Sequence, residues 1–201
     1  MSRPRGVRPI LLTAALLSGC VGEGAAPGPS GPGILIAGAL VLDGTGAEGV
    51  ISDVRIRGDR IESIGDLSPT GGEMVIDATG LTLAPGFIDT HSHHDRGLLE
   101  RRDALAALSQ GITTIVVGQD GGSPFPLGDF FERLEATPPT VNVASYVGHA
   151  VVRTAVMGDD YRRPATTAEV EAMKEVLRTE LSAGALGLST GLEYDVGLDA
   201  S

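Results

Sequence analysis

The chain has 201 residues, of which 42% are hydrophobic and 3% aromatic, and it contains no tryptophan and a single cysteine. This composition suits a soluble α/β fold built mainly from small and aliphatic residues, and one cysteine excludes an intramolecular disulfide. The formal net charge of −11 at pH 7 argues against nucleic acid as a partner, because phosphate backbones are bound by clustered lysines and arginines.

The amino-terminal residues are interpreted as a targeting segment. Three arginines precede an apolar run at residues 10–17, which is too short to span a bilayer permanently. Residues 17–20 (LSGC) resemble a bacterial lipoprotein box, which implies cleavage before Cys20 and lipidation of its sulfur. We therefore expect a lipoprotein signal peptide over residues 1–19 and a lipid-anchored protein of the bacterial cell envelope that faces the periplasm or the exterior. An ordinary secretory signal with an incidental cysteine is the alternative.

Two further segments precede the main fold. Residues 20–33 are dense in glycine and proline and have no apolar period, so we expect a flexible tether. Between residues 34 and 84, short β-rich runs alternate with turn signals such as Asp43-Gly44. This tight spacing predicts hairpins of a small β-sandwich segment and leaves no room for helices.

From residue 85 to residue 201, strands and helices are expected in alternation. A capping box, Thr166 with Glu169, predicts the start of the last helix, which Gly184 closes. Continuous apolar strands between helices predict a parallel sheet whose active site lies beyond the carboxyl ends of the strands. We expect strands at 87–90, 112–117, 141–147 and 185–189, and helices at 97–110, 128–135 and 166–184.

An Asp-x-His-x-His cluster comes at the end of the first of these strands. Alternate side chains of an extended strand share a face, so Asp89, His91 and His93 would point the same way. Two imidazoles on one face can hold a divalent cation, with zinc as the first candidate, and Asp89 can orient one of them. A surface strand that is His-rich by chance is the alternative.

Polar residues also follow the other predicted strands. Asp120 follows the second strand, His149 the third and Glu193 the fourth. Because the carboxyl ends of parallel strands meet at one edge of a sheet, this placement favours a shared site over chance.

Four segments carry a family resemblance. They are residues 85–93 (PGFIDTHSH), 111–118 (GITTIVVG), 142–149 (NVASYVGH) and 184–194 (GALGLSTGLEY). In this order they resemble the amidohydrolase superfamily, specifically its N-acyl-D-amino-acid deacylase (D-aminoacylase) branch. The resemblance implies a metal-dependent (β/α)8 barrel, of which this chain would supply the first four βα units after a small β-sandwich segment.

The resemblance also implies the metal ligands. His91 and His93 match the ligand pair of the first barrel strand, and Asp120 stands where this branch often has cysteine in an Asn-Cys-Gly context. A carboxylate is a harder ligand than a thiolate and favours different ions. One or two zinc ions are therefore expected, with other divalent metals left open, and an Asp120 that is only hydrogen-bonded is the alternative.

The remaining site residues follow from the same resemblance. His149, Glu193 and Tyr194 are implied as substrate-binding groups, and the alternative for His149 is a loop histidine that caps the third strand. A full barrel takes roughly 250 residues, so the chain looks truncated. The general base, an acid on the eighth strand in this family, is expected beyond Ser201.

The implied function is hydrolysis of non-peptide C–N (amide) bonds, by an N-acyl-D-amino-acid deacylase that acts on a small N-acyl amino acid or a related amide. A cyclic amidase or a dipeptidase-type amidohydrolase would share the paired histidines and is one alternative. A non-catalytic envelope lipoprotein fragment is the other.

Overall fold

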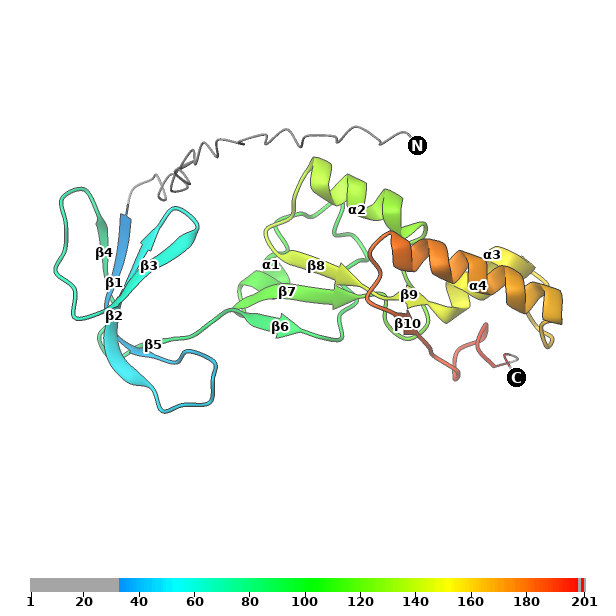
Figure 1. Ribbon diagram of the computed structural model, residues 1–201, viewed down its shortest axis with the longest axis horizontal. Helices are drawn as coiled ribbons and strands as arrows, with labels where there is room; N and C mark the ends of the chain where they lie inside the picture. Colours follow the sequence, from blue (N-terminus) through cyan, green and yellow to red (C-terminus); the bar gives the residue numbers. More distant parts are fainter. Residues whose placement is uncertain (1–32, 199, 201) are drawn as a thin grey trace, which may run out of the picture. The chain divides into compact units, whose positions relative to one another are not determined.

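The structure is a computed structural model that describes residues 33–198 and 200 (Figure 1). Contacts between Cα atoms divide the chain into two compact units, residues 1–83 and 84–201. The predicted signal peptide, Cys20 and the tether up to residue 32 lie outside the described residues. Among the residues that the structure describes, no helix is both long and apolar enough to cross a membrane.

The described part of the first unit is one five-stranded sheet of order β3-β2-β1-β4, in which β5 also pairs with β1. β2 is antiparallel to both neighbours, as hairpins require, whereas β4 and β5 run parallel to β1. Residues 33–83 contain no helix, as the sequence predicted, and the second layer of a sandwich stays a prediction. The strands are β1 (Gly33–Val41), β2 (Val50–Arg57), β3 (Arg60–Gly65), β4 (Met74–Asp77) and β5 (Thr82–Leu83).

A β-bulge in β1 bends this sheet. Gly38 adopts a left-handed φ of 72° at the register shift between Ile36 and Ala39, a conformation that glycine reaches without steric cost. The Asp53 carboxylate accepts the backbone N–H groups of Gly38 (2.7 Å) and Leu67 (2.9 Å). These two hydrogen bonds lower the pKa of Asp53 and fix the bulge against β2.

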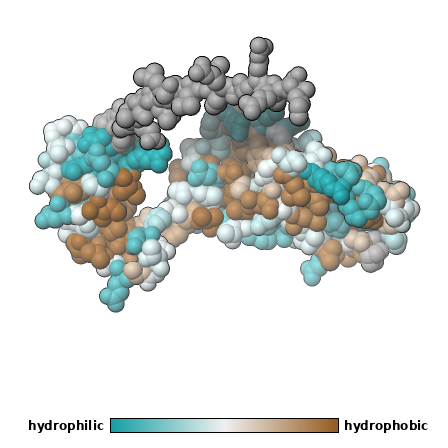
Figure 2. Space-filling model, in the orientation of Figure 1, coloured by the Kyte–Doolittle hydropathy of each residue, from teal (hydrophilic) through white to brown (hydrophobic). Residues whose placement is uncertain are grey.

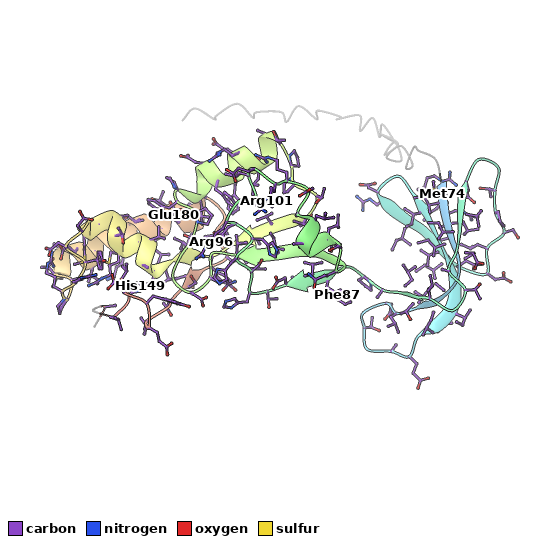
Figure 3. All side chains as sticks on the ribbon, turned by 180° about the vertical axis from the view of Figure 1, so that it is seen from behind. Met74, Phe87, Arg96, Arg101, His149 and Glu180 are labelled. Carbon is purple, nitrogen blue, oxygen red and sulfur yellow. The ribbon has the colours of Figure 1, made fainter. Side chains whose placement is uncertain are left out.

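An ion pair joins β2 to the segment before β4. Arg55 Nε donates to Glu73 Oε1 at 2.6 Å, and the backbone N–H of Thr70 donates to Glu73 Oε2 at 2.9 Å. The Arg55 hydrogen bond, followed by that from Thr70, lowers the pKa of Glu73 to about 2. Few apolar side chains are buried in this unit, and Met74 of β4 is exposed (Figure 3). Apolar residues are visible on its surface (Figure 2).

The second unit alternates parallel strands with helices. β6, β7 and β8 form a parallel sheet in chain order, and β9 pairs in parallel with β10. Only Tyr146 separates β8 from β9, and its N–H donates to the Val117 carbonyl of β7 at 3.0 Å. We therefore count β8 and β9 as one strand position. The four positions β6, β7, β8–β9 and β10 then follow the order of the chain. The elements are β6 (Phe87–Asp89), α1 (Leu105–Leu108), β7 (Ile112–Val117), α2 (Leu127–Ala136), β8 (Asn142–Ser145), β9 (Val147–Gly148), α3 (His149–Met157), α4 (Thr167–Ser182) and β10 (Leu188–Ser189).

The core of this unit lies between the strands and the helices. Ile115 and Val117 of β7 are fully buried and belong to one hydrophobic cluster with Leu127 and Phe130 of α2. Figure 1 shows α2 running along β8. The sequence predicted burial on both faces of the sheet, but Ile88 of β6 is 61% exposed, so burial is incomplete at this edge among the described residues.

Hydrogen bonds to carboxylates stabilise the starts of helices α4 and α2. Thr166 and Glu169 form the predicted capping box at the start of α4, and Arg163 donates to the same Glu169 carboxylate. Glu180 of α4 is 3% exposed, and its Oε2 accepts the backbone N–H of Leu127 at 2.8 Å. A helix of this second unit therefore caps the first turn of another.

Several predicted boundaries were wrong. The helix expected at 97–110 is reduced to α1, because Gly97 (φ 89°) and Ala104 (φ 43°) adopt left-handed conformations that interrupt a right-handed helix. The third predicted strand is split at Tyr146, and the fourth shrinks to β10. The sequence also missed α3, whose N-cap is Gly148 and which carries no side-chain capping signal.

The Glu73 ion pair predicts a pH dependence for the first unit. Because the folded-state pKa of Glu73 lies below its ordinary value of 4.5, its contribution to stability is complete above pH 4.5 and is lost as the pH falls towards about 2. Glu73→Gln should flatten this part of the stability profile, measured from urea midpoints by circular dichroism between pH 6 and pH 2.5. Glu48→Gln, which removes an exposed carboxylate without a hydrogen-bond partner among the described residues, should leave the profile unchanged; an equal effect of both variants would contradict the assignment.

The capping box predicts a local cost at α4. Thr166→Ala removes the side-chain acceptor for the Glu169 N–H and should lower the free energy of unfolding by about 1 kcal/mol, measured by urea denaturation. Thr167→Ala, one residue into the helix, should change it by less than about 0.5 kcal/mol. Equal costs at the two positions would show that the cap contributes nothing.

Candidate metal centre

The two predicted histidine ligands lie just beyond strand β6. The strand ends at Asp89, and Asp89 Oδ1 accepts the backbone N–H of His91 at 3.2 Å. The N–H of Ser92, which is 2% exposed, donates to the Val116 carbonyl at 3.0 Å. The segment between the histidines is thus attached to β7. The expected contact of Asp89 with an imidazole is replaced by this contact with the backbone.

Asp120 stands on a tight turn after β7. Gly118 (φ 76°), Asp120 (φ 56°) and Gly121 (φ 81°) are all left-handed. Gln119 Nε2 donates to the carbonyl oxygens of Thr90 (3.0 Å) and Val116 (3.1 Å). Gln119 therefore joins the Asp120 turn to the residue that precedes His91.

The structure brings His91, His93 and Asp120 together. One carboxylate oxygen, Asp120 Oδ2, lies 3.3 Å from His91 Nε2 and 3.1 Å from His93 Nε2. The two imidazole rings meet edge to face, with centroids 5.5 Å apart. All three side chains are partly exposed, at 59%, 44% and 33% respectively, so the cluster is open to solvent.

These donors fit a divalent cation. One ligand atom from each of the three residues can be chosen so that all lie within 4.8 Å of one another. Two ligands of one tetrahedral zinc ion, each about 2.1 Å from the metal, are separated by about 3.4 Å, close to both nitrogen–oxygen distances. Imidazole nitrogen and carboxylate oxygen are also ligands that zinc accepts. Three protein ligands with solvent access correspond to an open coordination site.

His149 directly follows β9, at the strand end where the sequence placed it. It is also the first residue of α3 and not part of a loop (Figure 3). Its Nδ1 atom is buried and has no hydrogen-bond partner among the described residues. Burial lowers the pKa of His149 below its ordinary value, and the positive charge of Arg153 lowers it further. Binding of substrate by His149 stays a prediction.

Glu193 and Tyr194 lie in the turn after β10, and both are exposed. The N–H of Tyr194 donates to the Gly191 carbonyl at 3.2 Å. Asp195, the next residue, accepts from the Tyr161 hydroxyl at 2.7 Å and from Arg162, which holds this turn against the segment between α3 and α4. Binding of substrate by Glu193 and Tyr194 stays a prediction.

Sequence reasoning missed Gln119 and Ser189, which hold the Asp120 turn. Ser189 Oγ accepts the backbone N–H of Gly121 at 3.2 Å. Both are polar residues at the carboxyl ends of predicted strands, and that position was the signal that could have identified them.

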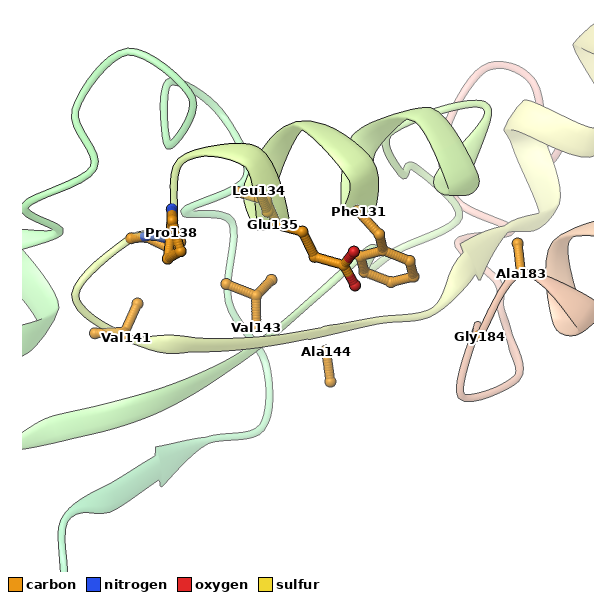
Figure 4. Close-up of a pocket in the computed structure, with 10 residues that line it drawn as sticks. Phe131, Leu134, Glu135, Pro138, Val141, Val143, Ala144, Ala183 and Gly184 are labelled. Atoms are coloured by element: carbon orange, nitrogen blue, oxygen red, sulfur yellow. The ribbon is translucent and has the colours of Figure 1, made fainter. Parts of the chain in front are cut away.

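A groove of about 480 Å³ lies at the opposite end of the strands (Figure 4). Leu134 and Glu135 of α2, Val143 of β8 and the Ala183–Gly184 turn line it. In Figure 4, Val143 points towards α2. Because this groove lies near the start of β8 while the cluster follows the ends of β6 and β7, it does not belong to the metal centre.

Comparison with known proteins connects this geometry to a family. A sequence profile described as the amidohydrolase family matches residues 74–199. A D-aminoacylase of Alcaligenes xylosoxydans xylosoxydans is 40% identical over 184 residues, which cover 80% of this chain and 38% of the relative.

Solved structures agree. A D-aminoacylase described as having a binuclear metal centre superposes with a TM-score of 0.76 at 41% identity. An N-acyl-D-glutamate deacylase from Bordetella bronchiseptica, complexed with zinc and a phosphonate mimic of the tetrahedral intermediate, gives a TM-score of 0.77 at 39% identity. Each match covers 84% of this chain and 40% of the other. The chain therefore spans about two fifths of the length of the relatives that it matches.

Proposed function

The chain belongs to the amidohydrolase family and resembles its N-acyl-D-amino-acid deacylase branch, and we propose a function from that membership. We propose that the chain carries part of a zinc-dependent amidase site. The observation that supports this most directly is the position of Asp120 Oδ2 within 3.3 Å of both imidazoles. The proposed substrates are small N-acyl-D-amino acids, the class named in the similar enzymes.

We also propose the first half of a (β/α)8 barrel as the fold around the site. Four parallel strand positions follow chain order, with helices between them. Active sites of such barrels lie at the carboxyl ends of the strands, which is where His91, His93 and Asp120 stand. In a closed barrel, side chains of further βα units would cover the exposed Ile88 of β6.

In the proposed mechanism, His91 and His93 each offer Nε2 to one or two zinc ions, and Asp120 offers a carboxylate oxygen. A bound zinc ion supplies Lewis acidity to the amide carbonyl and to a water molecule. Asp120 also contributes negative charge, which balances part of the cation's charge. Hydrolysis also requires a general base, which takes a proton from water and passes it to the leaving amine.

Substitution of the proposed metal ligands tests this site. In the full chain, His91→Ala and His93→Ala should each lose zinc, measured by elemental analysis, and should lose hydrolysis of N-acetyl-D-amino acids. Asp120→Asn should reduce both the zinc content and the rate of hydrolysis, because it removes the negative charge. Asparagine tolerates the left-handed φ of 56°, so the turn itself is kept.

His94→Ala is the matched control, because the His94 ring contacts Ser92 Oγ at 2.8 Å and does not take part in the cluster. Zinc content that stays unchanged in Asp120→Asn would show that Asp120 is only hydrogen-bonded. If the protein hydrolyses only N-acetyl-L-amino acids, or only a cyclic amide, the proposed substrate class is wrong.

We further propose that the mature protein begins at a lipidated Cys20 and is anchored in the bacterial cell envelope. The LSGC segment at residues 17–20 supports this, and it lies outside the described residues. Wild-type protein should partition into the detergent phase, and Cys20→Ser should remain unprocessed or move to the aqueous phase. Recovery of an unmodified soluble mature protein from wild-type cells would contradict the anchor.

A further inference from the structure

The Asp120 turn has three left-handed residues, Gly118, Asp120 and Gly121. Asp120 is the one with a Cβ atom, and aspartate adopts this region more readily than most residues but still only uncommonly, so contacts with its surroundings help to fix it. Its carboxylate nevertheless has to place one oxygen beside two imidazole nitrogens, at 3.3 Å and 3.1 Å. Contacts made to the backbone of this turn therefore control where that oxygen lies.

Gly191, in the turn after β10, makes one of these close contacts. A Cβ atom at Gly191 would lie 2.2 Å from the carbonyl oxygen of Asp120 and 2.7 Å from its carbonyl carbon. The φ angle of Gly191 is outside the left-handed region, so its backbone conformation does not require glycine. Glycine at this position is explained by the close approach to Asp120 and to the Tyr194 ring, whose Cδ2 atom would lie 2.5 Å from the same Cβ.

Ser189 holds the same peptide from the end of β10. Its Oγ accepts the N–H of Gly121 at 3.2 Å, and the N–H of Ala150 donates to the Gly121 carbonyl at 2.9 Å. The residue after Asp120 is thus bound on both sides of its backbone. Because β10 pairs in parallel with β9, Ser189 lies opposite Gly148 in the register and directly beside the Asp120 turn.

We propose that Ser189 and Gly191 are positioning residues for the metal centre, which fix the Asp120 peptide so that its carboxylate meets His91 and His93. This inference rests on the proposed function for the identity of the cation. Ser189 acts by accepting a hydrogen bond, and Gly191 acts by leaving space for the Asp120 carbonyl. The fourth strand thereby contributes to metal binding without supplying a ligand.

The variants Gly191→Ala and Ser189→Ala disturb the Asp120 turn in different ways. Gly191→Ala must move the Asp120 carbonyl from 2.2 Å to a van der Waals distance of about 3.5 Å or more, which displaces the attached carboxylate. Ser189→Ala removes the acceptor of the Gly121 N–H and adds no bulk. Partners that orient metal ligands typically affect metal affinity by about 10- to 100-fold.

The test measures zinc affinity of the full chain by competition with a chromogenic chelator. Gly191→Ala and Ser189→Ala should each weaken zinc binding by about 10-fold or more. Ser189→Thr keeps the acceptor oxygen and should restore affinity to within about 2-fold of wild type. Gly187→Ala is the matched control, since its Cβ would meet the Tyr146 ring at an ordinary 3.6 Å and the φ of Gly187 is also not left-handed.

A second measurement does not depend on the metal. Amide hydrogen exchange of Gly121 in the zinc-free protein should be faster in Ser189→Ala than in Ser189→Thr, because the former has lost the Gly121 hydrogen bond. Exchange that is equal in both variants overturns the inference, as does zinc affinity unchanged in both Gly191→Ala and Ser189→Ala.

The outcomes separate this inference from the proposed function. Wild-type protein that binds no zinc contradicts the proposed function, and the exchange of Gly121 then decides whether Ser189 positions the turn. If Gly191→Ala does not fold, the comparison of Ser189→Ala with Ser189→Thr decides.

Discussion

The geometry of the metal centre depends on how closely three strand-end turns approach one another. A Cβ atom at Gly148 would lie 2.2 Å from the carbonyl oxygen of Gly121, and one at Gly191 would lie 2.2 Å from that of Asp120. No residue larger than glycine fits at either position without displacement of the turn. This close backbone packing places the turn after β7 between the end of β9 and the turn after β10, and we propose that it sets the direction of the Asp120 carboxylate.

Asp120 differs from other carboxylates of this acidic chain in its partners. Glu73, Glu169 and Glu180 accept hydrogen bonds from arginine or from backbone N–H groups and so stabilise turns and helix starts. Asp120 contacts two imidazole rings, and neither an arginine nor a backbone amide donates to its carboxylate among the described residues. A carboxylate whose charge is not balanced in this way can contribute that charge to a bound cation.

The sequence predicted the metal cluster because its information is local. His91 and His93 are two residues apart at a strand end, and Asp120 lies in the turn after the next strand, so parallel pairing brings them to one edge. The contributions of Ser189 and Gly191 were not predicted. Ser189 reaches a backbone N–H 68 residues away in the sequence, and a glycine selected for space on a neighbouring turn resembles any other turn glycine.

The sequence by itself predicted the alternation of strands and helices, the capping box at Thr166 and the paired histidines at a strand end, because each follows from neighbours within a few positions. The family resemblance implied Asp120 as the partner of these histidines. The tertiary structure decided the parallel pairing of β4 with β1 and the loss of the helix expected at 97–110. Left-handed Gly97 and Ala104 interrupt that helix, and Arg102 between them donates to the carbonyl oxygens of Leu99, Arg133 and Thr137. Two of these acceptors lie more than thirty residues away along the chain. Hydrogen bonds and steric contacts between distant segments outweigh local helix propensity, and a pattern read along the chain does not contain them.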